Sequence, residues 1–407
     1  MKIVVFGLTV SSSWGNGHAT LWRGLIHALT EAGRQVVFVE RDAPWYRDTR
    51  DLHDLPGGRL LLYAEWAEVL ALKRDLLDAD ALIVTSYCPD ARAATDLIAH
   101  EGRGAAVFYD LDTPVTLARL AAGEPVDYLP ETGLGMFDLV LSYTGGRALD
   151  ALTGQLGARR ALPLYGHVDP VAHRPVPTRE MFRGDLSYLG TYAADRQAKL
   201  ERLFVEPAGR APERRFVLGG SQYPADFPWR PNIHFMNHVG PADHPAFFCS
   251  SRLTLNVTRG DMAAMGWCPS GRLFEAAACG APILSDDWDG LGAFFTPGEE
   301  ILLADGADEV LGALALSDAE LRRIAEAARA RVLAEHSSAT RARELVEIIE
   351  SIPLSYSGER EGPAREASGS ERGRADRLAP ANSASSDLAF GSATLSPEGE
   401  RETMRAA

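Results

Sequence analysis

The amino-acid sequence predicts an α/β protein made of two Rossmann-like domains, each with a parallel sheet covered by helices. The chain has 407 residues, which is too long for one ordinary hydrophobic core and suits two α/β domains. Hydrophobic residues make up 46%, as in globular proteins. Short runs rich in valine, isoleucine, leucine and phenylalanine alternate with longer helical stretches, a pattern typical of parallel strands buried on both faces.

The first half of the chain predicts an N-terminal domain over residues 1–168. Apolar runs predict its strands at residues 2–8, 35–40, 81–87, 105–109, 138–142 and 160–164. Helices are predicted between them at residues 18–32, 90–101, 113–121 and 145–157. Gly33 stands just after the first helix, at a position that favours glycine.

A proline-rich stretch at residues 169–177 interrupts this rhythm and predicts the linker between the domains. The apolar runs that follow predict a C-terminal domain over residues 169–335, with strands at residues 186–189, 215–218, 233–236, 253–257, 282–285 and 301–304. Helices rich in arginine and alanine are expected at residues 319–333 and 339–349. The segment 336–352, which contains the second of them, is expected to return to the first domain. Residues 353–407 are poor in apolar side chains, and their composition predicts a disordered tail.

The charge balance excludes some classes of partner. Lysine and arginine total 41 against 56 acidic residues, and the net charge of −15 makes nucleic acid an unsuitable main partner. No run of about 18 apolar residues exists, so we expect no transmembrane segment. The four cysteines are widely spaced and form no metal-ligand pattern, which favours a cytoplasmic protein with free thiols and no bound metal.

The loop after the first predicted strand is the first candidate site. Ligands of doubly wound sheets bind beyond the carboxyl ends of the strands, where a helix N-terminus offers amides to anions. The loop and the helix start contain Trp14, Gly15, Asn16, Gly17 and His18. The glycines come too late for a dinucleotide fingerprint, whose third glycine is replaced by Thr20, and this argues against a nicotinamide cofactor. His18 could donate a hydrogen bond to a sugar or phosphate, act as a base, or simply cap the helix.

Two carboxylates follow the strand predicted at residues 105–109. Asp110 and Asp112 are expected at the same edge of the sheet as His18, where one could act as a general base or hold acceptor hydroxyls. The competing interpretation is an N-cap before the helix opened by Pro114. The two roles are balanced for Asp110, and Asp112 fits the cap better. We take His18, Asp110 and Arg196 as candidate catalytic residues.

The second half contains a sharper pattern. Ser270 and Gly271 open a short alanine-rich helix that ends at Gly280 and leads into a buried strand. The helix amides and Arg272 could hold a diphosphate, and Glu275 could accept hydrogen bonds from ribose hydroxyls.

Two further loops with glycines or cations follow predicted strands. The first contains Gly190 and Thr191 and leads to Arg196 and Lys199, three residues apart on one helical face. The second contains Gly219 and Gly220. Each loop alone is compatible with a purely structural role, whereas several such loops together favour a phosphate-binding cleft.

The segment from Arg272 to Leu284 resembles the donor site of two-domain GT-B glycosyltransferases of the glycogen-synthase-like superfamily. Over residues 1–350 the chain more closely resembles the CgeB-like, or spore maturation protein-like, family of glycosyltransferases. The resemblance implies a hexosyltransferase-like, metal-independent enzyme without a cofactor. Its nucleoside-diphosphate sugar would lie on the C-terminal domain and its unknown acceptor on the N-terminal domain. It also implies that Glu275 holds the donor ribose and that Arg196 and Lys199 face the leaving phosphate.

One position departs from the superfamily pattern. A second glutamate often stands eight residues before the first, facing the donor sugar, and here that residue is Trp267, with Asp261 nearby. The sequence therefore leaves open whether transfer retains or inverts the anomeric configuration. It also leaves open a nucleotide-sugar epimerase or hydrolase on the same fold, and a catalytically silent protein of a surface or spore-coat assembly.

Overall fold

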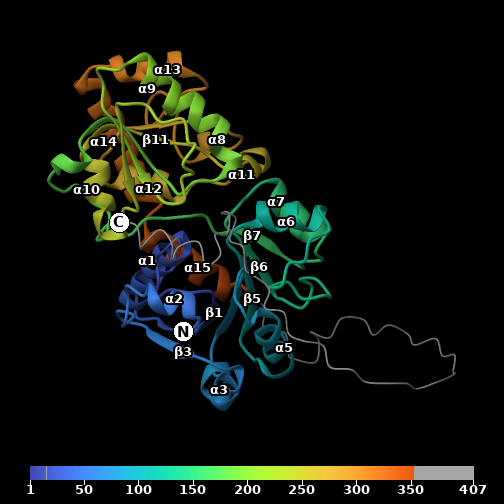
Figure 1. Cartoon of the computed structure of the whole chain (residues 1–407). Coiled ribbons are helices and arrows are strands. Elements are labelled where there is room, and N and C mark those ends of the chain that lie inside the picture. Colours follow the sequence, from blue (N-terminus) through green and yellow to red (C-terminus); the bar gives the residue numbers. More distant parts are fainter. Residues whose placement is uncertain (15, 353–407) are drawn as a thin grey trace.

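The structure, a computed structural model, describes residues 1–14 and 16–352 and contains two parallel sheets in separate lobes (Figure 1). The first sheet has seven strands in the order β3-β2-β1-β4-β5-β6-β7. Its strands are β1 (Lys2–Gly7), β2 (Gln35–Arg41), β3 (Arg59–Tyr63), β4 (Ala81–Thr85), β5 (Ala105–Asp110), β6 (Leu139–Ser142) and β7 (Ala161–Pro163). Its helices are α1 (Gly17–Glu31), α2 (Pro44–Asp48), α3 (Trp66–Ala71), α4 (Lys73–Leu77), α5 (Ala91–Glu101), α6 (Thr113–Ala121) and α7 (Arg147–Gly154).

The second sheet has six strands in the order β10-β9-β8-β11-β12-β13. Its strands are β8 (Gly184–Leu189), β9 (Phe216–Gly220), β10 (Ile233–Asn237), β11 (Ser251–Asn256), β12 (Ile283–Ser285) and β13 (Leu302–Leu303). Its helices are α8 (Ala194–Leu200), α9 (Glu206–Arg210), α10 (His244–Cys249), α11 (Gly260–Met265), α12 (Gly271–Ala278), α13 (Ala307–Ala315) and α14 (Asp318–Glu335). A π-helical turn, η2 (Glu201–Val205), joins α8 to α9, and shorter turns are η1 (Glu180–Phe182), η3 (Pro241–Asp243) and η4 (Leu291–Ala293).

Apolar side chains cover both faces of each sheet. In β1, Val4 and Phe6 enter one core cluster, and Ile3 and Val5 enter the cluster on the opposite face. A strand buried on both faces reads as a continuous apolar run, which is why the sequence predicts these strands well. The fold class is confirmed, and the predicted strands are present with ends shifted by a few residues.

Some elements differ from the sequence prediction. β3 was not predicted, and it is a short edge strand in which Arg59 and Leu62 are exposed. α7 is shorter than predicted and begins at Arg147. Gly15 and the predicted tail at residues 353–407 lie outside the described residues.

The strand order places a ligand crevice in each domain. The order reverses between β1 and β4 in the first sheet and between β8 and β11 in the second. The connections leaving neighbouring strands at such a point run to opposite faces, which opens a crevice at the carboxyl ends of the strands. The loops after β1, β8 and β11 therefore stand where a ligand is expected.

The chain passes between the domains at two points that lie side by side. Val168, before the linker, accepts a hydrogen bond from the Ser338 amide at 2.8 Å and donates its own amide to the His336 carbonyl at 3.0 Å. Helix α15 (Ser338–Glu350) then packs on α1 of the first domain (Figure 1). Its Leu345 and Ile349 belong to the core cluster that contains Ile3 and Val5 of β1. The last described helix thus completes the core of the first domain.

This packing predicts that the folding of the first domain depends on α15. Leu345 is 1% exposed, and Leu345→Ala should lower the free energy of unfolding by about 2–5 kcal/mol because it removes buried methyl groups and leaves a cavity. Urea unfolding monitored by circular dichroism gives the value. Glu347→Ala, at an exposed position of the same helix, is the matched control and should change stability by less than about 0.5 kcal/mol. Equal effects of the two variants would show that α15 adds little to this core.

Candidate functional site

A cleft of about 620 Å³ lies between the two domains and is lined by residues from both. The loops after β1, β8 and β11 all contribute to its walls. Most of the residues that the sequence predicts as site residues line it: Asn16, Gly17, His18, Asp112, Gly190, Thr191, Arg196, Gly220, Ser270, Gly271, Arg272 and Glu275. The sequence-based grouping therefore corresponds to one continuous cavity.

Four predicted residues lie outside the lining of this cleft. Trp14 stacks edge-on against Trp45 at a centroid distance of 5.1 Å. Asp110 is fully buried, and Gly219 is a buried residue of β9. The Lys199 ammonium lies 2.5 Å from the buried Asp286 carboxylate. Lys199, which we expected to face a phosphate, therefore forms an ion pair within the protein. Their proposed roles in binding and catalysis stay predictions.

The N-terminus of α12 is the best-formed anion site in the cleft. Ser270 is the N-cap residue, but its side chain makes no capping hydrogen bond. The amides of Gly271 and Arg272 have no acceptor in the part of the chain that the structure describes. Free amides and the positive end of the helix dipole both favour a phosphate group.

The composition of α12 explains why Glu275 faces the cleft. Leu273, Phe274, Ala276, Ala277 and Ala278 are buried in the core of the second domain. The side left for Glu275 is the side that borders the cavity. Gly280 ends the segment with a φ of +74°, a conformation that glycine adopts without strain. An apolar helix with a single carboxylate thus presents that carboxylate to the cleft.

Three arginines line the cleft around the α12 N-terminus. Arg272 lies over the Tyr188 ring, 5.2 Å from its centroid, and donates to Asn256 Oδ1 at 3.1 Å. Arg196 donates to the Thr191 carbonyl at 2.8 Å, and its Nε atom is buried with no partner among the described residues. Arg259 is held by Asp195 at 3.1 Å. The sequence analysis did not predict Arg259 as a site residue. Arg259 lies just after β11, and the position of a cation after a predicted strand is the signal that could have identified it.

Two glycines allow the backbone to approach these arginines closely. A Cβ atom on Gly190 would lie 2.9 Å from Arg272 Nη2. A Cβ atom on Gly220 would lie only 2.0 Å from the Gly190 carbonyl oxygen. The Gly220 contact is with backbone, so the two loops can pack this closely only with glycine at position 220, whereas the Gly190 contact is with the mobile end of the Arg272 side chain.

The Glu275 carboxylate lies between two imidazoles. Its oxygens are 3.9 Å from His173 Nε2 and 3.7 Å from His244 Nδ1. Burial alone would raise the pKa of Glu275, but His173, His244 and Arg272 together lower that pKa to about 2. Glu275 is therefore an anion at neutral pH and an acceptor of hydrogen bonds. Neither histidine was predicted, because each is a single residue in a loop or at a helix start without a local pattern.

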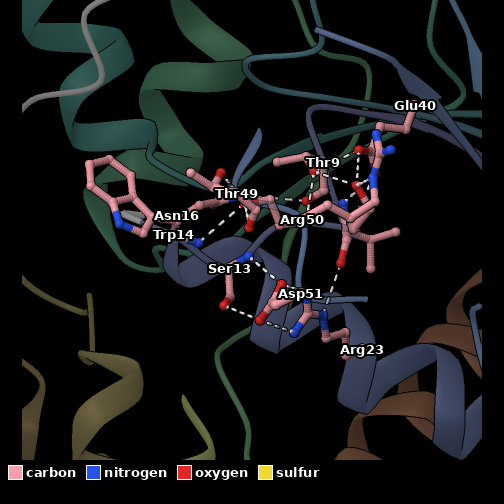
Figure 2. A network of polar contacts seen from close by, with 12 residues as sticks. Thr9, Ser13, Trp14, Asn16, Arg23, Glu40, Thr49, Arg50 and Asp51 are labelled. Carbon is pink, nitrogen blue, oxygen red and sulfur yellow. Dashed lines mark hydrogen bonds and ion pairs between the residues drawn. The ribbon is translucent and has the colours of Figure 1, made fainter. Parts of the chain in front are cut away.

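The loop after β1 differs from the α12 N-terminus because carboxylates from β2 and from the segment after α2 accept hydrogen bonds from its amides (Figure 2). The buried Glu40 carboxylate accepts from the amides of Val10 at 2.8 Å and Ser11 at 3.0 Å. Asp51 accepts from the Ser13 amide at 3.0 Å and forms a two-pronged ion pair with Arg23. The amides of Val10, Ser11 and Ser13 therefore already have acceptors within the protein.

His18 and Asp112 face each other on the wall formed by the first domain. His18 Nε2 lies 3.6 Å from Asp112 Oδ2, and both side chains are largely buried. Burial lowers the pKa of His18, and the Asp112 charge only partly offsets this. The imidazole is therefore neutral at neutral pH. The Asn16 side chain accepts from the His18 amide at 3.0 Å and caps α1, so His18 itself is not the cap.

Asp110 and Asp112 have different surroundings although both follow β5. Asp112 occupies the N-cap position of α6, as predicted, but its side chain makes no capping bond. Asp110 Oδ1 accepts from the Asp112 amide at 3.1 Å, whereas Oδ2 is buried without a partner among the described residues. Burial raises the pKa of Asp110 to about 6. Asp110 thus lies beneath the cleft and positions the Asp112 backbone.

Trp267 connects the two domains. It has a φ of +51°, and its carbonyl accepts from the Gly145 amide of the first domain at 3.0 Å. Cβ atoms on Gly146 and on Gly290 would each lie 2.6 Å from the indole, so the ring fits between two glycines from different domains. The indole does not line the cleft, and Asp261 is exposed. Neither side chain is among the residues that line the cleft.

Comparisons with known proteins agree with this architecture. Residues 196–347 match a family model described as glycosyl transferase-like. Among solved structures, the chain is similar to a sucrose-phosphate synthase from Thermosynechococcus elongatus, with a TM-score of 0.61, 15% identity, and coverage of 86% of this chain and 98% of that one. It is also similar to an alpha-glucosyltransferase in complex with UDP-glucose and DNA, with a TM-score of 0.65, 12% identity, and coverage of 86% and 100%.

A third similar structure is HepE of Anabaena in complex with UDP and glucose, with a TM-score of 0.60, 13% identity, and coverage of 86% and 100%. No curated protein sequence matches the chain significantly. The fold is therefore the two-domain GT-B arrangement, and the CgeB-like subfamily stays a prediction. No helix in the described residues is long and apolar enough to cross a membrane.

The buried Asp110 predicts a pH dependence of stability. A carboxyl with a higher pKa in the folded than in the unfolded chain favours folding at low pH, and this contribution disappears as the pH rises through the folded pKa, here about 6. Relative to Asp110→Asn, the wild type should therefore lose about 2 kcal/mol of stability between about pH 4.5 and about pH 7. Urea unfolding at several pH values measures this. Asp96→Asn, at an exposed position, should show no such trend, and a constant difference for Asp110→Asn would contradict the assignment.

Proposed function

We propose that the protein is a glycosyltransferase that moves a sugar from a nucleoside-diphosphate sugar to an acceptor hydroxyl. The observation that carries the proposal is the asymmetry of the cleft. Its C-terminal wall holds free helix amides, three arginines and the Glu275 anion, and its N-terminal wall holds the neutral His18 with Asp112. One wall suits a diphosphate and a ribose, and the other suits a hydroxyl group that must lose a proton.

The donor lies on the C-terminal domain. Its diphosphate binds the amides of Gly271 and Arg272 and the guanidinium groups of Arg196 and Arg272, which offset its charge. Its ribose hydroxyls donate to Glu275, one helical turn further along α12. The glycosyl transferase-like family match over residues 196–347 and the UDP-containing similar structures support this placement.

The acceptor lies on the N-terminal domain beside His18. In the transfer, the acceptor oxygen forms a bond to the anomeric carbon of the sugar, and the bond from that carbon to the diphosphate breaks. The bonding electrons leave with the diphosphate, whose developing charge the arginines and the α12 amides stabilise. His18 accepts the acceptor proton, and Asp112 stabilises the imidazolium that results. Asp110 supports Asp112 from below.

The transfer needs no metal ion in this proposal. Divalent ions serve glycosyl transfer by neutralising the leaving diphosphate, and here Arg196, Arg259 and Arg272 surround the α12 N-terminus. We propose a protein that works in the cytoplasm without a cofactor, consistent with its four free cysteines. The finer assignments, including a hexosyltransferase of the CgeB-like type, belong to the proposal.

The direct test measures donor turnover with and without acceptors. A thermal-shift screen against UDP, GDP, dTDP, ADP and their sugars first identifies the donor, since a ligand that binds only the native state raises the melting temperature. Sugar transfer that requires an acceptor would support the proposal. Equal turnover without any acceptor would favour an epimerase or hydrolase. Failure to bind any nucleoside diphosphate would favour a catalytically silent protein.

Glu275→Gln should weaken the binding of the identified nucleoside diphosphate by about tenfold or more. The variant removes a charge-assisted hydrogen bond worth roughly 1.5–3 kcal/mol, while glutamine keeps the shape of the side chain. The 2′-deoxy form of the ligand should lose less, because one hydroxyl is already absent. Calorimetry on both proteins with both ligands gives the coupling. Glu326→Gln, at an exposed position of α14, is the matched control, and equal affinities across the Glu275 substitution would remove this residue from the donor site.

Transfer activity should survive treatment with EDTA. The three arginines and the α12 amides supply the positive potential that a divalent ion supplies elsewhere. The measurement compares the initial rate before and after chelation and dialysis. A loss of activity that magnesium or manganese restores would contradict the metal-independent mechanism.

A further inference from the structure

Three metal-ligand types converge beside the α12 anion site. His173 comes from the interdomain linker, His244 is the first residue of α10, and Glu275 comes from α12. One side-chain nitrogen or oxygen of each lies within 4.8 Å of the others, and within the described residues no other group of histidine, cysteine, aspartate and glutamate meets this condition. Two imidazoles and a carboxylate are the protein ligands of many zinc sites.

The nitrogen atoms that face Glu275 are unsatisfied. His173 Nε2 and His244 Nδ1 are both buried, and neither has a hydrogen-bond partner among the described residues. The His173 side chain is only 8% exposed. A buried polar atom without a partner costs free energy, so a ligand that satisfies both nitrogens would stabilise this arrangement.

The backbone determines which nitrogen of His244 carries the hydrogen. His244 Nε2 lies 3.2 Å from the Val239 carbonyl oxygen, which can only accept. Nε2 is therefore the donor, and in the neutral ring Nδ1 presents a lone pair toward Glu275 Oε2 at 3.7 Å. A lone pair and a carboxylate repel each other unless a proton or a metal ion lies between them. Metal-ligating histidines commonly donate their other nitrogen to a carbonyl in this way.

We propose that His173, His244 and Glu275 bind a divalent transition-metal ion, with zinc the best fit. Zinc takes three such ligands and leaves a fourth position open, and bonds of about 2.0–2.2 Å place tetrahedral ligand atoms about 3.4 Å apart. Side-chain movements of about 1 Å would bring the three atoms to that spacing. Imidazole ligands select against magnesium and calcium, which prefer oxygen. All three residues line the cleft, so the open position faces it.

The ion and the donor ribose then compete for Glu275. This part of the inference rests on the proposed function, whereas metal binding itself does not. The ion takes no part in transfer. Zinc acts instead as a competitive inhibitor of donor binding, and nucleoside diphosphate reduces the apparent affinity for zinc. The same carboxylate that makes the donor site selective also makes it sensitive to zinc.

In the test, a chelator first removes any metal from the full chain. Zinc is then added in the presence of a chromophoric chelator that competes with the protein for the ion, and the absorbance gives the affinity of the protein for zinc. We expect one site that His173→Gln and His244→Gln each weaken at least tenfold. His234→Gln, which removes an exposed histidine, should leave the affinity unchanged. Magnesium should not compete. Melting temperatures of the variants show that they are folded. Wild-type zinc affinity no higher than that of the double variant His173→Gln/His244→Gln would overturn the proposal.

Cobalt distinguishes this site from a thiolate site. Cys249 is partly exposed, and its pKa is lowered to about 7 by its hydrogen bond to Cys279, so it is a competing ligand. Cobalt bound by nitrogen and oxygen gives visible d–d bands without a sulfur charge-transfer band, and Cys249→Ser should leave that spectrum unchanged. A sulfur band that disappears in this variant would overturn the assignment. Zinc binding without nucleoside diphosphate binding would leave the metal site standing and defeat only the proposed function, and the reverse result would defeat only the metal site.

Discussion

Which part of the cleft can bind an anion depends on which backbone amides already donate hydrogen bonds to acceptors within the protein. In the loop after β1, the buried Glu40 and the arginine-paired Asp51 accept from the amides of Val10, Ser11 and Ser13. At the start of α12, the Ser270 side chain leaves the amides of Gly271 and Arg272 free. The loop after β1 and the start of α12 border the same cavity, but only the amides of Gly271 and Arg272 have no acceptor among the described residues. This difference is the basis for our proposal that the C-terminal domain holds the charged part of the ligand.

The second constraint is the fixed contact between the domains. Trp267 adopts a left-handed backbone conformation and fits its indole between glycines of both domains. Such strain persists only where the surroundings enforce it, and here hydrogen bonds to Gly145 and Asp289 hold the residue on both sides. Where the resemblance leads us to expect a glutamate, this chain has a tryptophan that forms a contact between the domains.

The sequence predicts much of this because the relevant signals are local. Strands buried on both faces read as apolar runs, and glycines or cations after strands indicate the crevice. The position of Arg272, Glu275 and His18 at the cleft could therefore be predicted, whereas their roles stay predictions. The ion pair of Lys199 could not be predicted, because its partner Asp286 is distant in the sequence. His173 and His244 could not be predicted as site residues, because only their distance from Glu275 in the fold distinguishes them from other histidines. The sequence favours the N-cap position for Asp112, whereas the complete burial of Asp110 is visible only in the structure.

Hydrogen–deuterium exchange on the full chain, with and without the nucleoside diphosphate that binds, tests the central claim most directly. The amides at the start of α12 are free in the unliganded protein, whereas those of the β1–α1 loop are already bonded to Glu40 and Asp51. We therefore expect the ligand to slow exchange in a peptide covering residues 270–275 and to leave a peptide covering residues 9–13 unchanged. Protection of the β1–α1 loop without protection of α12 would contradict the account.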